Sequence, residues 1–273
     1  MPTEVNGLLD QARLQDYHHD PQWHRDVIEH YQFNLQRMIR LAQQAQIPLI
    51  LVNPVSNLKD CPPFKTEPGI SVSGADQEQL QRLWDEAQLS PVLETRIERL
   101  QEAIQLDPRH AGVQYHLGKC YEAAGQFEQA KACLLIAKDQ DVCPLRMLEP
   151  MHTRLLSIAK ETRTPLVDAR QLLEDQSDEG ITSNKVLLDH VHPTIEAHQS
   201  IAAALLEKMI QLKILSAREG WQTVQVQHYR DHLGQLPEAY YERGKQRLAG
   251  LRLWTQGRAG ELNLQPPPEP SQP

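Results

Sequence analysis

The sequence predicts an α/β protein in which helices dominate: a partial parallel sheet that is interrupted by an all-helical insertion, with extra helices near the C-terminal end. Two short apolar runs, at residues 47–52 and 165–168, each follow a stretch with helical spacing. Such runs are typical of buried parallel strands. Between them, residues 76–144 show only helical patterns. Loop insertions of this size are tolerated because the entropy cost of closing a loop grows slowly with its length.

Composition and charge exclude several classes of function. The formal net charge is −8, and lysine and arginine are spread along the chain, which argues against a nucleic-acid surface and against binding to anionic lipid. No apolar run reaches the roughly 20 residues that a membrane-spanning helix needs. Met1–Asn6 lacks the basic and apolar regions of a signal peptide. We therefore expect no nucleic-acid partner and no membrane segment. The cellular location stays open, with the cytoplasm as the default.

The cysteines give no sign of a disulfide framework or of a metal site. Cys61, Cys120, Cys133 and Cys143 form no C-x-x-C pair. Their low density is typical of buried thiols. Their spacing also does not fit a structural zinc site. We predict no metal and no cofactor.

The first α/β part begins with a polar segment. Residues 1–24 are predicted to be a loop or a short helix, and His18, His19 and His24 are interpreted as part of a solvated N-terminus, with weak metal chelation as the alternative. Residues 25–45 have helical spacing and lead to a predicted strand at 48–52. The loop 57–64 then lies at the carboxyl end of that strand, where ligands bind in open α/β sheets.

The insertion carries a repeat motif. Leu117-Gly118-x-x-Tyr121 is the L-G-x-x-Y core of a tetratricopeptide repeat, and Gly125 and Ala130 continue the pattern. A second repeat lies one repeat length upstream, where Ala103 aligns with Ala137, and its first helix, around Leu80, is degenerate. The small residues predict a close crossing of two antiparallel helices with a glycine near the turn. A generic helical hairpin is the alternative.

The α/β pattern resumes after Pro144. It predicts helices at 150–162, 169–175 and 195–215, a strand at 165–168, two helices within 221–256 and a disordered tail at 265–270. The predicted division is 1–75 (first α/β part), 76–144 (helical insertion), 145–215 (second α/β part), 216–262 (C-terminal helices) and 263–273 (tail).

The chain resembles the SGNH (GDSL-like) hydrolases, in a form that carries a tetratricopeptide insertion. The resemblance depends on four segments in this order: 57–64, 111–141, 165–168 and Asp189-x-x-His192-Pro193. It implies a flavodoxin-like three-layer fold and acyl-ester chemistry. It also implies that Asp189 and His192 are the catalytic acid–base pair, in which His192 accepts a serine proton while Asp189 holds the imidazole tautomer.

The chain departs from that family at the nucleophile. It has no Gly-Asp-Ser block and no G-x-S-x-G elbow, so the resemblance covers only the C-terminal part of the fold. We expect the strand at 48–52 to leave an apolar edge open. Two explanations stay open: the chain is part of a longer protein, or it is a natural remnant whose repeat helices or open edge bind a protein partner.

Other constellations in the chain have alternative interpretations. Asn57 and Lys59 follow a strand end and are predicted to line a substrate cleft, although a capped turn explains them as well. Ser56 is a candidate for a displaced nucleophile. His190 and His192 form an H-x-H pair that could bind a metal. Asp189 and His192 could also be a purely structural pair.

Three functions therefore compete. The first is the C-terminal portion of an SGNH-type esterase or acyltransferase, inactive alone, with an acetylated polysaccharide, a lipid or a small ester as substrate. The second is a non-catalytic module that binds proteins through the repeat. The third is a generic helical repeat protein, which predicts no parallel strands at 48–52 and 165–168.

Overall fold

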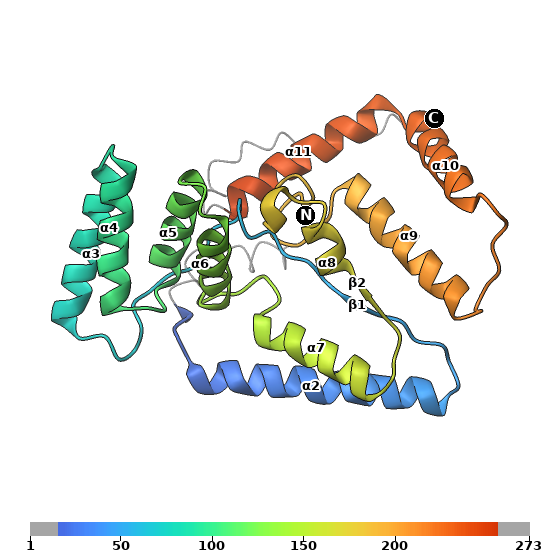
Figure 1. Cartoon of the computed structure of the whole chain (residues 1–273), viewed down its shortest axis with the longest axis horizontal. Helices are drawn as coiled ribbons and strands as arrows, with labels where there is room; N and C mark the ends of the chain where they lie inside the picture. The colour runs from blue at the N-terminus through green and yellow to red at the C-terminus, as the bar shows by residue number, and fades with distance from the viewer. Residues whose placement is uncertain (1–15, 256–273) are drawn as a thin grey trace, which may run out of the picture.

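Helices dominate the computed structural model, which describes residues 16–255 (Figure 1). The chain folds into a repeat region of four helices, a layered unit around two short strands, and two C-terminal helices. No helix among the described residues has the length and apolar character that crossing a membrane requires.

The first helix of the layered unit, α2, spans Pro21–Gln44. The Asp20 carboxylate caps it by accepting the backbone N–H groups of Gln22 and Trp23, and Pro21 occupies the first turn, where a missing N–H costs nothing. Helix α2 therefore begins four residues before the predicted start at 25, and the assignment of residues 21–24 to the polar N-terminal segment was wrong.

The sheet consists, within the described residues, of two strands in parallel: β1 (Leu51–Asn53) and β2 (Leu166–Asp168). Leu51 pairs with Leu166 and Asn53 with Asp168. The prediction of parallel strands at these two places is confirmed, which argues against a generic helical repeat protein. Both strands are shorter than predicted, because the ladder begins where the Leu51 N–H donates to the Pro165 carbonyl, and Pro48 has no N–H to extend it.

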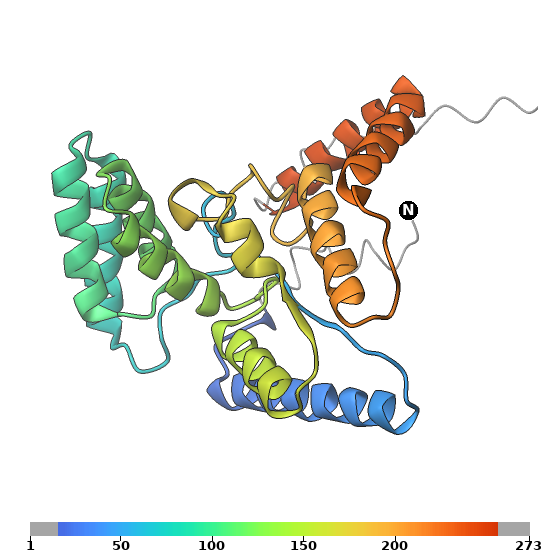
Figure 2. The same cartoon turned by 45° about the vertical axis from the view of Figure 1, so that its right-hand side comes forward.

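Two helices cover each side of this sheet (Figure 2). On one side α2 packs with α7 (Glu149–Glu161) over β1, around a core of Leu35, Ile39, Leu51, Leu155, Ile158 and Ala159. On the other side lie α8 (Ala169–Glu174) and α9 (Ile195–Gln211). Their core contains Val55, Leu173, Val186, Leu187 and Ala197. A 3₁₀ turn at Asp178–Gly180 follows α8.

The repeat region contains α3 (Gly74–Leu89), α4 (Leu93–Leu106), α5 (Ala111–Ala123) and α6 (Phe127–Asp139). Each helix packs against the next one in the chain. The predicted close crossing is confirmed at Gly118, where an added Cβ atom would lie 2.9 Å from the Leu134 side chain. The turn glycine Gly125 has φ +74°, which favours glycine.

The last two helices, α10 (Trp221–Gln235) and α11 (Glu238–Thr255), have no buried residue between positions 221 and 250. They are separated at Leu236 and Pro237, near the predicted break. The predicted tail at 265–270 lies outside the described residues.

Candidate functional site

The Asp189–His192 motif lies in a tight loop that joins the layered core to α9. The loop is closed at its base by a bridge between Leu187 and Pro193, and the Leu188 N–H donates to the His192 carbonyl at 2.7 Å. Thr194 then caps α9 by accepting the Ala197 N–H. The cap and the bridge fix both ends of the loop, so its side chains are held in place.

Asp189 and His192 are in direct contact, as the spacing predicted. The Asp189 Oδ2 atom lies 2.7 Å from His192 Nδ1, and Asp189 Oδ1 accepts the backbone N–H groups of Val191 and His192 at 2.8 Å each. The Asp189 side chain is 3% exposed and that of His192 is 68% exposed. Burial alone would raise the pKa of Asp189, but these hydrogen bonds hold it below its ordinary value. Asp189 is therefore a buried carboxylate that orients an exposed imidazole.

This arrangement has the geometry of a carboxylate–imidazole pair. With Nδ1 held by a carboxylate, the other ring nitrogen of His192 can accept a proton. Within residues 16–255, no serine hydroxyl hydrogen-bonds to His192. Ser56, the displaced candidate, is buried beside a cluster of charged side chains instead.

Asn57 is buried and adjoins the same loop. Its backbone N–H donates to the His190 carbonyl at 2.9 Å. Its side-chain amide donates to Asn184 Oδ1, and its side-chain oxygen accepts the Asp60 N–H, each at 3.0 Å. The amide end of this side chain therefore joins the loop after β1 to the loop before α9, and its oxygen caps a turn within its own loop, as in the alternative interpretation of a capped turn.

Lys59 lies on the repeat-region side of that loop. Its ammonium group forms an ion pair with Glu122 of α5, and its carbonyl accepts the Tyr115 hydroxyl at 2.9 Å. The structure thus brings together Asp189, His192 and the backbone of Asn57, whereas the Lys59 ammonium points to the insertion.

Arg146, a buried residue that contacts this part of the chain, was not found by sequence reasoning, and His190 of the loop was suggested only as half of an H-x-H pair. The Arg146 guanidinium donates to the carbonyls of Asn57 and Cys61 at 3.0 and 2.8 Å. Burial, and then the nearby Arg146 charge, lower the pKa of His190 to about 4. His190 is 2% exposed and points inward, while His192 points outward, so the H-x-H pair does not converge on a metal. No group able to hold a metal ion occurs in the described part of the chain.

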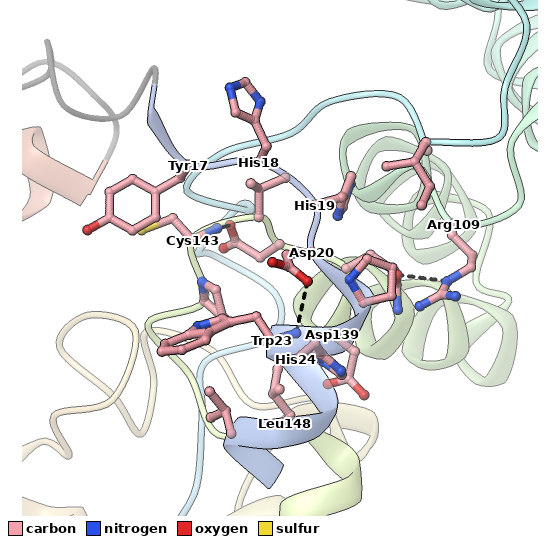
Figure 3. A pocket seen from close by; sticks show the side chains of 18 of the residues that line it. Tyr17, His18, His19, Asp20, Trp23, His24, Arg109, Asp139, Cys143 and Leu148 are labelled. Atoms are coloured by element: carbon pink, nitrogen blue, oxygen red, sulfur yellow. Dashed lines mark hydrogen bonds between the residues drawn. The ribbon is translucent and has the colours of Figure 1, made fainter.

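A separate cleft of about 550 Å³ lies where the N-terminal end of α2 meets the last turn of α6 (Figure 3). Its apolar lining comes from Tyr17, Trp23, Val27, Ile70, Val142, Pro144 and Leu148. None of the four predicted site residues lines it. The three N-terminal histidines do, at a junction between regions, where His18 is exposed and His19 and His24 are half-buried.

Most carboxylates of the cleft accept hydrogen bonds from backbone N–H groups. Asp20 caps α2, Asp107 accepts the N–H groups of Gly69 and Arg109, and Asp141 accepts those of Phe64, Lys65 and Cys143. Burial raises the pKa of Asp141. By contrast, the guanidinium groups of Arg25 and Arg109 bond to the glutamine side chains of Gln22 and Gln140 and make no ion pair among the described residues.

A family model for the tetratricopeptide repeat matches residues 97–144 of this chain. The match spans α4 through α6 and supports the prediction of repeats in the insertion. No curated protein and no solved structure matches the chain. The resemblance to SGNH hydrolases receives no support from these comparisons.

Proposed function

We propose that this protein is an interaction module that binds a peptide segment of a partner protein in the cleft between α2 and α6. The observation that carries the proposal is the position of the cleft at the end of the matched repeat, since Asp139, Gln140 and Asp141 of its lining close that repeat. Stacked repeat helices are used widely as binding surfaces.

The lining of the cleft supports a peptide with a bulky apolar side chain. Ile70 is 73% exposed and Trp23 is 68% exposed, and apolar groups gathered at a concave site mark binding surfaces. Arg25 and Arg109 add donors that suit peptide carbonyl or carboxylate groups. The carboxylates are already bonded, so they compete little for these guanidinium groups.

The test is a peptide display selection on the full chain, followed by titration of a selected peptide. Ile70→Glu puts a charge into the apolar lining, and we expect it to weaken binding at least about tenfold, or about 1.4 kcal/mol. Leu89→Glu is the matched control, because Leu89 is exposed at the end of α3 and does not line the cleft. Equal affinity of both variants would contradict the proposal.

A second candidate is acyl-ester chemistry at Asp189 and His192, supported by the 2.7 Å contact between a buried carboxylate and an exposed imidazole. In that role His192 takes the proton of a serine hydroxyl as its oxygen bonds to the ester carbonyl carbon. It returns the proton to the alkoxide that leaves when the ester C–O bond breaks. The serine is supplied from outside residues 16–255.

Hydrolysis of a model aryl ester tests this candidate. If the chain carries a complete site, His192→Ala should lower kcat/KM by about a thousandfold or more. His198→Ala is the matched control, because His198 is an exposed histidine on α9. Measurable hydrolysis at equal rates in His192→Ala, His198→Ala and the unmodified protein would reject catalysis by this pair without affecting the peptide proposal.

A further inference from the structure

The outer face of α2 carries a charge pattern that the functions above do not use. Ile28, Leu35 and Ile39 form its buried face. On the opposite face Phe33 is 55% exposed. The helix lies along the edge of the molecule in both views (Figures 1 and 2), so this face is open along its length.

Four charged residues share the face with Phe33. Asp26 and Glu29 come seven and four positions before it, and Arg37 and Arg40 come four and seven positions after it. Residues at these intervals lie on the same side of a helix. All four charged residues are exposed. Along α2, this face therefore carries two acidic residues, then Phe33, and then two basic residues.

These charges form no ion pairs with other described residues. Asp26 accepts a hydrogen bond from the Gln22 side chain, and no ion pair involving Asp26, Glu29, Arg37 or Arg40 occurs within residues 16–255. The acidic half and the basic half of one α2 helix cannot reach each other across the intervening turns. A second helix with the same pattern, running in the opposite direction, would place an opposite charge against each of these four charges.

We propose that α2 is a homodimer interface, in which a second copy of this chain packs its α2 antiparallel to the first. Phe33 then lies at the twofold axis. Asp26 faces Arg40 of the partner subunit, and Glu29 faces Arg37 of the partner subunit, with both pairs repeated by symmetry. A twofold interface must be self-complementary. The charge pattern of this face is self-complementary only when the two helices run antiparallel. A parallel copy would set like charges against each other.

The contact is small, so the dimer is weak. A helix of 24 residues is about 36 Å long, and one helix pair falls at the low end of specific interface areas. Each chain also carries a net charge of −8, although salt screens this long-range repulsion more than it weakens close ion pairs. We expect dissociation in the micromolar range, roughly 1–100 µM.

Sedimentation velocity over about 1–200 µM protein measures this directly. The wild-type chain should shift from 31.2 kDa monomer toward twice that mass as concentration rises. Arg37→Glu/Arg40→Glu makes the face wholly acidic, and Asp26→Lys/Glu29→Lys makes it wholly basic. Each variant alone should stay monomeric, and an equimolar mixture should form a heterodimer. Arg82→Glu/Arg218→Glu has the same change in net charge as the acidic variant, at exposed sites off α2, and should dimerise like wild type.

The charge-inverted variant Asp26→Lys/Glu29→Lys/Arg37→Glu/Arg40→Glu separates self-recognition from general charge effects. It restores self-complementarity, so it should dimerise with itself, and it should not pair antiparallel with the wild-type chain, because each of its charges would then face a like charge. Circular dichroism confirms that each variant is folded. A wild-type chain that stays monomeric over the whole range overturns the proposal, and so does a dimer that the acidic or basic variant leaves unchanged.

Discussion

In the repeat region each helix packs against the helix that follows it in the sequence, whereas the layered unit is built from partners that lie far apart. Helix α5 packs on α6 directly, but α2 packs on α7 and β1 pairs with β2 across the whole insertion. The core of the repeat region is continuous from Leu80 to Cys133. The layered unit has two separate small cores. Local packing supplies most of the first region, although Ala130 and Leu134 of α6 also share a buried cluster with Leu58 and Ile181 of the layered unit. The second region depends on the contacts that hold its distant parts together.

A network of charged side chains joins the two regions. Lys138, near the end of α6, is 1% exposed and donates to the Met147 carbonyl at 2.6 Å and to Glu149 at 2.8 Å. Glu149 also accepts Arg170 of α8 at 2.8 Å. The repeat region is thus anchored through a buried ammonium group to the start of α7, and Lys131 of α6 also pairs directly with Glu174 of α8 at 2.8 Å.

The largest expected effect comes from breaking this anchor. Lys138→Ala leaves a cavity and removes the cation beside Asp139, while Glu149 keeps its bonds to Arg170, and we expect a loss of about 2–5 kcal/mol in the free energy of unfolding. Urea unfolding measures it. Lys119→Ala is the control, because the Lys119–Glu122 ion pair is partly exposed and should cost under about 1 kcal/mol. A loss below about 1 kcal/mol in Lys138→Ala would mean that the network does not hold the regions together.

Acid should destabilise the layered unit through two buried histidines. Burial, followed by nearby positive charges, lowers the pKa of His152 and of His190 to about 4 from 6.5. Between these values the unfolded chain binds protons that the folded chain does not, so stability is full above about pH 6.5 and falls as the pH decreases toward 4. Each histidine contributes up to about 3 kcal/mol to this loss.

Thermal or urea unfolding at several values from about pH 7.5 to pH 4.5 checks this slope. His190→Gln should flatten it. The double variant with His152→Gln should flatten it further, although not to zero, because burial also lowers the pKa of His110 and His116 in the repeat region. An unchanged slope in both variants would show that His190 and His152 are not the groups responsible.

The same difference between regions explains what the sequence could predict. The L-G-x-x-Y pattern at Leu117–Tyr121 predicted a local hairpin, and the three-residue spacing of Asp189 and His192 predicted a contact within one loop. By contrast, the burial of Arg146 under Asn57 and the cleft between Trp23 and Cys143 depend on contacts between distant segments. The spacing of apolar residues within one segment does not indicate which distant segments contact each other. The start of α2 was predictable from the Asp20–Pro21 capping signal and was overlooked.

A methyl group at Gly118 should weaken mainly the packing of α5 on α6 in the repeat region. In Gly118→Ala the new Cβ meets Leu134 Cγ at 2.9 Å and the Ala130 carbonyl at 3.2 Å, so α5 and α6 must move apart. We expect a cost of about 1–3 kcal/mol. Hydrogen exchange should become faster in α5 and α6 and stay unchanged in β1 and α7. Equal acceleration in both regions would show that they unfold as one unit.

The smallest effect on stability is expected in α11, which has neither the local packing of the repeat region nor the long-range packing of the layered unit. Gly244 lies in α11, and no other part of the described chain comes within 4 Å of the position that a Cβ atom would take there. Gly244→Ala therefore adds no clash and raises the local helix propensity by up to about 1 kcal/mol. Since no residue from 221 to 250 is buried, this gain should slow hydrogen exchange in α11 and leave the unfolding midpoint of the rest unchanged. A raised midpoint for the whole protein would mean that α11 unfolds together with the layered unit, and that its exposed surface is coupled to the core more tightly than its packing implies.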